Sequence, residues 1–265
     1  MCAPDWLALR EDADAAARSP ELADRVRIHL GNGPVTVRDL GCGTGAMGRW
    51  LAPRLPGPQR WVLHDRDPVL LARAAAHPPA GPVTVQTTRA DLTTVAAADL
   101  ADTSLVTASA LLDLLTADEV DALAAACVDA GCAALWTLSV AGRVEIDPPE
   151  PLDVELAAAF DAHQRRRVDG RRLLGPDAGA AATDAFTVRG AAVELRPSPW
   201  RLAARGSALV EEWLRGWIDA ACAQSPALER HADAYLRRRL DTAAVGALRV
   251  EVGHVDVLAL PAGAP

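Results

Sequence analysis

Three alternating glycines near residue 40 could hold backbone N–H groups against a small ligand. Residues 35–40 before them are rich in β-branched and apolar side chains and predict a strand. Gly41, Gly43 and Gly45 break that strand, and residues 46–51 continue with apolar side chains at helical spacing. A strand, a glycine turn and a helix in this order present N–H groups and the positive end of a helix to a ligand. Glycine suits the turn because a Cβ would block close approach or forbid a positive φ.

The acid Asp39, two residues before the first glycine, separates two classes of ligand. Gly43-x-Gly45-x-x-Gly48 also fits the dinucleotide fingerprint of an NAD(P)-dependent oxidoreductase. Asp39 would lie at the carboxyl end of the first strand, where it would repel a pyrophosphate but could meet an ammonium group. A methionine-derived ligand carries such a group, so Asp39 favours that class. A glycine turn without any ligand is the remaining alternative.

Residues 39–45, Asp-Leu-Gly-Cys-Gly-Thr-Gly, resemble motif I of the class I S-adenosylmethionine (SAM)-dependent methyltransferases. The resemblance covers about residues 35–140 by motif and the rest of the chain by topology only. It implies SAM as the cofactor and S-adenosylhomocysteine as the product. It also implies an α/β fold, a Rossmann-like, seven-stranded, doubly wound sheet with strand order 3-2-1-4-5-7-6, here with helical insertions. Four cofactor-binding residues follow from the motif: Asp39, Gly41, Gly43 and Gly45.

Asp65 ends the second predicted strand, residues 60–65, roughly 20 residues after the glycine turn, as such folds require. An acid at this place suits a bidentate hydrogen bond to a ribose diol. Asp65 occupies that position in the family pattern, and we expect its neighbour Arg66 to contact the cofactor too. Asp67 is the alternative ribose ligand, but its position before Pro68 also suits a helix cap.

The third and fourth predicted strands, residues 83–87 and 104–109, supply the other expected cofactor contacts. The resemblance implies that Asp91 accepts the exocyclic amine of adenine while Leu92 packs against the ring. An ordinary turn aspartate is the alternative for Asp91. Ser109 ends the fourth strand, and in a parallel sheet this carboxyl end faces the ligand site. We therefore expect Ser109 at the cofactor.

Two titratable side chains are candidate general bases. His163 lies on the apolar face of a predicted helix over residues 152–167 and is the first choice. Asp113 lies in the loop after the fourth strand and could take a proton from a substrate hydroxyl or amine. The alternatives are a hydrogen-bonded structural histidine and an ordinary exposed loop acid.

Two segments extend beyond the α/β alternation, and both follow strands that should end on the ligand side. We expect them to stand over the acceptor, with Trp200, Arg143 and Arg201 in contact with it. The expected division is an N-terminal helical segment, 1–34; a SAM-binding core, 35–141; a helical insertion, 142–175; a core continuation, 176–196; a helical lid, 197–245; and a final core strand, 246–265.

The composition excludes several function classes. All 27 basic residues are Arg, so chemistry that needs a lysine, such as Schiff-base formation or a Walker A loop, is excluded. A net charge of −8 argues against a broad nucleic-acid or anionic-membrane surface. There is no run of 18 apolar residues and no signal-peptide pattern. The five cysteines, odd in number and without CxxC spacing, predict a reducing, cytoplasmic compartment and no metal site.

The sequence therefore predicts a SAM-dependent methyltransferase that acts on a small-molecule acceptor, with no nucleic-acid or membrane partner. Oxygen, nitrogen and carbon all remain open as the methylated atom, and the oligomeric state is open too. The alternative that keeps the same cofactor is a SAM-dependent enzyme of a non-methylating type, or a non-catalytic SAM-binding subunit.

Overall fold

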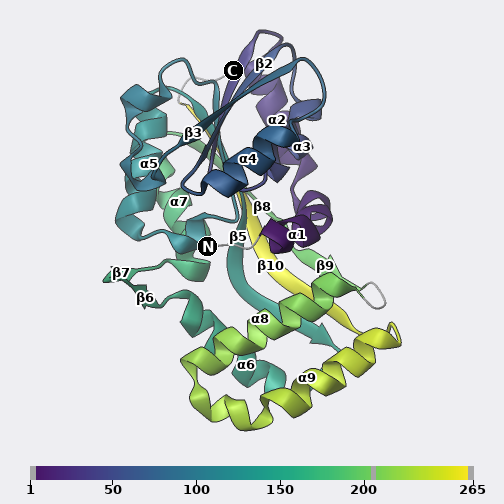
Figure 1. Cartoon of the computed structure of the whole chain (residues 1–265). Coiled ribbons are helices and arrows are strands. Elements are labelled where there is room, and N and C mark those ends of the chain that lie inside the picture. The colour runs from purple at the N-terminus through teal and green to yellow at the C-terminus, as the bar shows by residue number, and fades with distance from the viewer. Residues whose placement is uncertain (1–3, 204–206, 262–265) are drawn as a thin grey trace.

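The computed structural model describes residues 4–203 and 207–261, and a mixed sheet forms its centre (Figure 1). The strands of this sheet are β1 (Val35–Leu40), β2 (Gln59–Asp65), β3 (Val83–Arg89), β4 (Leu105–Ser109), β5 (Ala133–Asp147), β8 (Ala192–Pro197), β9 (Trp200–Leu202) and β10 (Arg249–Leu260). Their order is β3-β2-β1-β4-β5-β10-β8, with β9 paired to β10. β1 to β5 run parallel, and β10 is antiparallel to its neighbours. The predicted fold class and order are confirmed, whereas β9 was not predicted.

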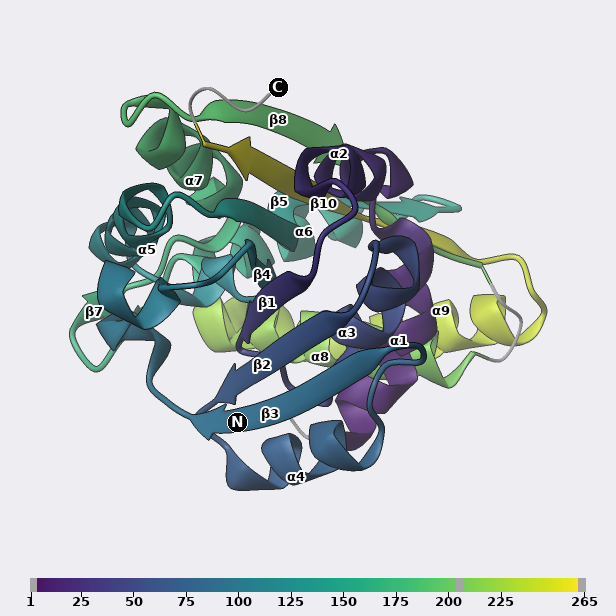
Figure 2. The ribbon, with the colours of Figure 1, turned by 90° about the horizontal axis from the view of Figure 1, so that it is seen from above.

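Helices cover both faces of the sheet. They also form a separate layer beyond the strand ends, at the bottom of Figure 1. They are α1 (Pro4–Ala17), α2 (Pro20–Leu30), α3 (Ala46–Leu51), α4 (Pro68–Ala76), α5 (Ala117–Asp129), α6 (Leu152–Gln164), α7 (Ala178–Thr187), α8 (Ala208–Gln224) and α9 (Glu229–Ala244). Figure 2 shows α5 and α7 on one face of the sheet, with α2, α3 and α4 on the other. Because helices cover both faces, nearly all side chains of β2, β4 and the first half of β5 are buried, whichever face they point to.

β5 and β10 continue past the sheet as a long antiparallel ribbon that carries α6, α8 and α9 (Figure 1). β5 runs to Asp147, past the expected end of the core at residue 141. The first residues of the predicted insertion 142–175 are therefore strand. The extension forms because the amino-terminal half of β10 pairs with it, and because Ile146, Val250 and Val252 bury their side chains against the helical layer.

The ribbon is irregular where it leaves the sheet, opposite the buried carboxylate of Asp256. β10 shifts its register against β5 between Val255 and Val257, and Leu138 has a positive φ of 57°. The Leu138 N–H donates to Asp256 Oδ1 at 2.8 Å, and the Ser19 N–H donates to Asp256 Oδ2 at 2.8 Å. Asp256 is 0% exposed. One carboxylate thus joins β10, the bulge of β5 and the start of α2.

The predicted N-terminal helical segment consists of two helices that meet at Ser19. The Ser19 hydroxyl accepts a hydrogen bond from the Leu22 N–H at 3.2 Å, which caps α2. Cys2 lies outside the described residues, as do short parts of the predicted divisions 1–34, 197–245 and 246–265. Among the helices that the structure describes, none combines the length and apolarity needed to cross a membrane.

Asp256→Asn should lower the free energy of unfolding by about 2 kcal/mol, because an amide can accept only one of the two backbone N–H groups and leaves the other buried and unpaired. Urea unfolding followed by circular dichroism measures the effect. Asp219→Asn, on the exposed surface of α8, is the matched control and should change stability by less than about 0.5 kcal/mol. Equal stability of both variants would contradict this account of the bulge.

Candidate active site

The glycine loop between β1 and α3 needs glycine at each alternating position. Gly41, Gly43 and Gly45 all have positive φ, at 66°, 54° and 84°. A Cβ added at Gly43 would lie 3.2 Å from Leu7 Cδ1 of α1, so this helix packs directly against the loop. A branched side chain at Gly43 would be both strained and crowded.

Two buried groups of opposite charge lie beside this loop with part of their hydrogen-bonding capacity unused. Asp39 is 1% exposed; its Oδ1 accepts from the Thr107 hydroxyl at 2.8 Å, while its Oδ2 has no partner among the described residues. Arg18 is 3% exposed and donates from Nη2 to Ser109 Oγ at 3.0 Å, but Nε and Nη1 find no acceptor in the described chain. Buried polar atoms are normally paired, so these atoms indicate a place for a ligand.

Burial raises the pKa of Asp39 to about 7, and the positive charge of Arg18 acts in the opposite direction. A cation against Oδ2 would favour the ionised carboxylate. A ligand that carries both an ammonium and a carboxylate, as the methionine part of SAM does, matches this pair of groups. Sequence reasoning identified Asp39 and Ser109 but missed Arg18, because nothing in its local pattern distinguishes it from the many other arginines.

Asp65 closes the glycine loop from the end of β2. Its Oδ2 accepts from the Gly43 N–H at 3.0 Å, and its Oδ1 accepts from the Asp67 N–H at 2.9 Å. Asp67 instead accepts from the Val69 N–H at 2.8 Å and caps α4. The side chain of Arg66 is exposed. Asp65 therefore lies at the loop, as a ribose ligand would need to, and Asp67 has the geometry of a cap.

Leu92 and Asp91 lie at the other side of the loop. A Cβ at Gly41 would meet Leu111 at 3.2 Å and Leu92 at 3.4 Å, so Leu92 provides an apolar wall there. Asp91 is exposed and accepts from both the N–H and the hydroxyl of Thr93, which lowers its pKa. Its carboxylate is thus engaged in a turn, and an adenine contact for it stays a prediction.

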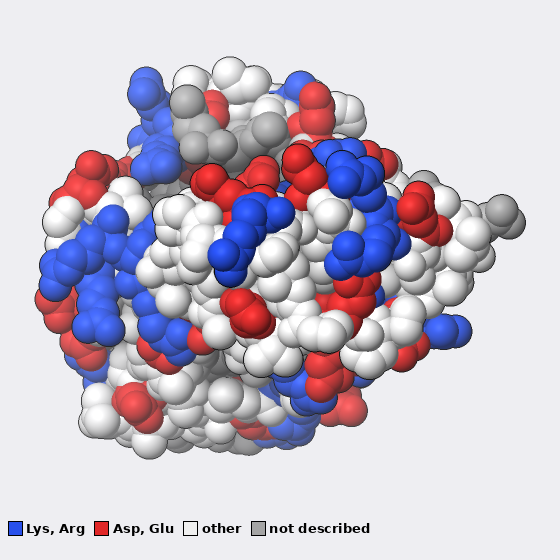
Figure 3. Space-filling model, turned by 90° about the horizontal axis from the view of Figure 1, so that it is seen from below, with Lys and Arg blue, Asp and Glu red and all other residues white. Residues whose placement is uncertain are grey.

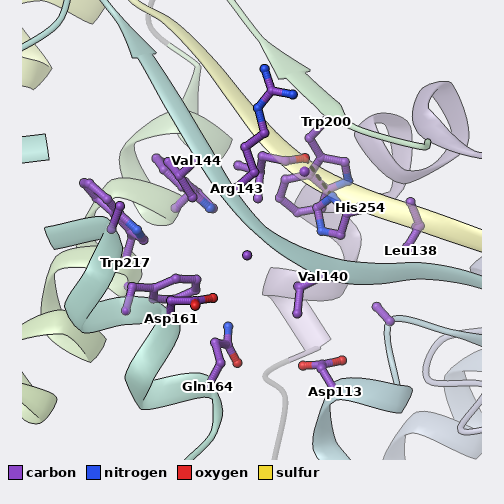
Figure 4. Close-up of a pocket in the computed structure, with 18 of the residues that line it drawn as sticks. Asp113, Leu138, Val140, Arg143, Val144, Asp161, Gln164, Trp200, Trp217 and His254 are labelled. Carbon is purple, nitrogen blue, oxygen red and sulfur yellow. Dashed lines mark hydrogen bonds between the residues drawn. The ribbon is translucent and has the colours of Figure 1, made fainter. Parts of the chain in front are cut away.

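A cavity of about 310 Å³ lies where the end of β4 and the middle of β5 meet α1, α6 and α8 (Figure 4). Aromatic side chains and three acids dominate its wall. It is lined by Trp6, Arg10, Ala110, Asp113, Leu138, Val140, Gly142, Arg143, Val144, Ala157, Phe160, Asp161, Gln164, Trp200, Glu212, Trp213, Gly216, Trp217, Val252, Gly253 and His254.

The structure brings Asp113, Trp200 and Arg143 to this cavity, but not Arg201. Side chains alternate along β9, so Trp200 is buried at 3% exposure while Arg201 points outward to pair with Glu251 at 3.3 Å. Trp200 Nε1 donates to Asp14 Oδ1 at 3.0 Å, which fixes the indole.

His163, the first choice for a base, is not among the described residues that line the cavity. Successive residues of a helix differ in direction by about 100°. Leu156 and Ala159, on the same face as His163, pack into the hydrophobic layer with α8 and α9. The neighbouring face, with Phe160 and Gln164, lines the cavity instead. Most of the apolar stripe of α6 thus lies on the packed face, while Phe160 lies at its border and contributes to both the cluster and the cavity wall.

A different histidine, His254, lines the cavity. It is 5% exposed, and its Nδ1 lies 2.9 Å from the Val252 carbonyl oxygen. A carbonyl can only accept, so the neutral ring carries its proton on Nδ1 and keeps Nε2 as an acceptor. Burial lowers the pKa of His254 to about 4, and Arg10 adds to the effect, so the ring is neutral near pH 7. No local sequence signal indicates this role, because His254 lies inside a strand beside Gly253.

Residues 37–130 match the family model described as a methyltransferase domain. This stretch is a methyltransferase domain. The resemblance to class I SAM-dependent methyltransferases is thereby confirmed, and SAM is the cofactor of that class. No curated protein matches the chain.

Solved structures that resemble this chain include three bacterial proteins. The YcgJ protein of Bacillus subtilis is 13% identical, with a TM-score of 0.48 over 91% of this chain and 98% of that one. The cyclopropane synthase MmaA2 of Mycobacterium tuberculosis is 13% identical, with a TM-score of 0.46 over 89% and 82%. A SAM-dependent methyltransferase of Mesorhizobium loti is 17% identical, with a TM-score of 0.42 over 91% and 99%.

The outer face of the helical layer carries arginines and acids in a mixture, with arginines grouped toward the left (Figure 3). The hairpin of β6 (Arg167–Val168) and β7 (Arg171–Arg172) follows α6. Near it, Arg165 pairs with Asp177 at 2.8 Å and Arg171 pairs with Glu119 at 2.5 Å. Acidic partners thus neutralise part of the positive charge of the arginines on and beside this hairpin.

Asp65→Ala should weaken SAM binding by about 1.5–3 kcal/mol, because it removes a charged hydrogen-bond acceptor and releases the N–H of Gly43. Asp67→Ala is the matched control: it should cost about 1 kcal/mol of stability through loss of the α4 cap and leave SAM affinity nearly unchanged. Isothermal calorimetry with SAM and urea unfolding separate the two effects. The reverse ranking of SAM affinities would contradict the assignment of Asp65.

Proposed function

We propose that this chain is an enzyme that methylates a small molecule held in the cavity between α1, α6 and α8. The observation that carries the proposal is the position of the cavity. Ala110 and Asp113, which line it, directly follow β4, and β4 ends at Ser109, the partner of Arg18. A ligand at the glycine loop and a second ligand in the cavity would therefore be neighbours. An acceptor held beside the donor reacts faster because binding has already brought the two groups together in the right orientation.

In this proposal the chain holds the cofactor through complementary charge and shape. Asp39 binds the ammonium and Arg18 the carboxylate of the methionine part, while Asp65 binds the ribose and Leu92 lies against the base. Bound SAM supplies a methyl group that its sulfonium makes electrophilic. Gly41, Gly43 and Gly45 allow the backbone to approach closely.

The acceptor half of the proposal assigns different roles to the two titratable groups of the cavity. His254 Nε2 accepts a hydrogen bond and orients the acceptor, since a histidine with a pKa of about 4 is a weak base. Asp113 takes a proton where the acceptor must lose one, because burial raises its pKa above the ordinary range of an aspartate. Trp6 and Trp200 cover the cavity and exclude water. His163 is not among the described residues that line this cavity, so the proposal assigns it no role.

The proposal is tested by incubating the protein with methyl-labelled SAM and separate fractions of metabolites, nucleic acid and protein. Label should enter the metabolite fraction. Label found only in a macromolecular fraction would overturn the small-molecule assignment. SAM bound with no transfer to any fraction would favour a SAM-binding subunit without catalysis.

Asp113→Asn should lower kcat by about 10²-fold or more while leaving the Kd for SAM unchanged. Activity of the wild type should fall as the pH drops through the pKa of Asp113, because only the ionised carboxylate takes a proton. This acid limb should lie above pH 4, the ordinary range of an aspartate, since the pKa of Asp113 is raised. Asp118→Asn, exposed on α5, is the control and should keep the wild-type kcat and profile. An unchanged acid limb in Asp113→Asn would remove Asp113 as the base.

A further inference from the structure

Both arginines of the cavity wall already have acidic partners. Arg10 donates from Nε to Asp14 Oδ2 at 3.0 Å. Arg143 lies 2.6 Å from Glu145 Oε1, and its guanidinium points away from the cavity (Figure 4). Neither cation is therefore available to neutralise an anionic ligand at full strength.

Two of the three acids in the cavity wall, Asp113 and Asp161, could each accept a further hydrogen bond. Asp113 forms no ion pair in the described part of the chain, and burial raises its pKa. Asp161 pairs with Arg165 through Oδ2 at 2.5 Å, but its buried Oδ1 has no hydrogen-bond partner among the described residues. A carboxylate held out of water without a partner is costly, and a cation in the cavity would offset that cost.

Gly142 is what brings Asp161 so close to the ribbon. A Cβ at this position would lie 2.7 Å from Asp161 Oδ1, and Gly142 has a positive φ of 67°. Any other residue would displace the carboxylate and strain β5. The position of Asp161 against the cavity wall is thus built into the backbone.

Aromatic rings complete the wall. Trp213 and Trp217 stack with ring centroids 5.4 Å apart and planes 14° from parallel. Across the cavity, the ring of Trp200 already receives a cation on its face, since the guanidinium carbon of Arg10 lies 4.8 Å from its centroid. Indole faces attract cations and also pack well against flat or apolar groups.

We propose that this cavity selects an organic cation, an ammonium group attached to an aromatic or apolar body, as the acceptor. Asp113 and Asp161 bind the ammonium, and the indoles of Trp213 and Trp217 hold the body. The inference rests on the proposed function for calling this molecule the acceptor, but the binding preference itself can be measured without SAM.

Three probes that share a phenylethyl group and differ in charge test the preference by isothermal calorimetry on the full chain. They are 2-phenylethylamine, which is a cation at pH 7; 2-phenylethanol, which is neutral; and 3-phenylpropionate, which is an anion. The amine should bind at least tenfold more tightly than either of the others. Equal affinities, tighter binding of the anion, or no binding of the amine at millimolar concentration would overturn the inference.

Substitutions locate the preference. Asp113→Asn should reduce the advantage of the amine over the alcohol to less than threefold, while the isosteric control Asp118→Asn keeps it. Trp213→Leu should weaken the amine and the alcohol alike and leave their ratio within twofold of the wild type. Circular dichroism confirms that each variant is folded. An amine advantage that survives Asp113→Asn and Asp161→Asn together would overturn the assigned carboxylates.

Calorimetry with SAM alone separates failure of this inference from failure of the proposed function. SAM binding together with a cavity that prefers the anion would overturn only the cation inference. Amine selectivity in a protein that binds no SAM would instead overturn the methyltransferase proposal and leave the cation site standing.

Discussion

The buried carboxylate of Asp256 is the contact on which the arrangement of both sites depends. It accepts the N–H groups of Leu138 and Ser19, so it fixes the bulge of β5 and the start of α2 at once. The bulge turns Leu138 toward the cavity, and the start of α2 places the adjacent Arg18 beside Ser109. Burial raises the pKa of Asp256, and its hydrogen bonds and the positive charge of Arg18 partly offset that rise. A single desolvated acid therefore helps to position both the glycine-loop side and the cavity side of the molecule.

Much of the fold could be predicted because its signals are local. Apolar and β-branched residues are concentrated in the segments that become the parallel strands, and Ser19 and Thr116 mark helix starts by their capping chemistry. The length of β5 could not be predicted in this way. Residues after Val140 become strand only because β10, more than a hundred residues later, supplies the ladder and the apolar partners. Non-local pairing of this kind has no signature in either segment alone.

The residues of the candidate site also differ in whether a local signal or a non-local contact determines their place. Asp39, the three glycines and Asp65 follow from spacing, since strand ends in a parallel sheet share one edge. Arg18 and His254 do not, because only tertiary contacts make one a buried donor and the other a neutral acceptor. For α6 the apolar periodicity was correctly recognised, but it identifies the packed face. The ligand face is the adjacent stripe, which is more mixed in polarity.

The helical layer and the sheet have separate hydrophobic cores. α6, α8 and α9 share one cluster with the outer half of the β5–β10 ribbon, while the faces of the sheet have two clusters of their own. A substitution on the inner side of α8 thus disturbs the packing of one cluster. The glycine loop rests on a different cluster, which the substitution does not touch. Such a division predicts that successive changes in the helical layer reshape the cavity without disturbing the core behind the glycine loop, as the same changes in a single shared core would.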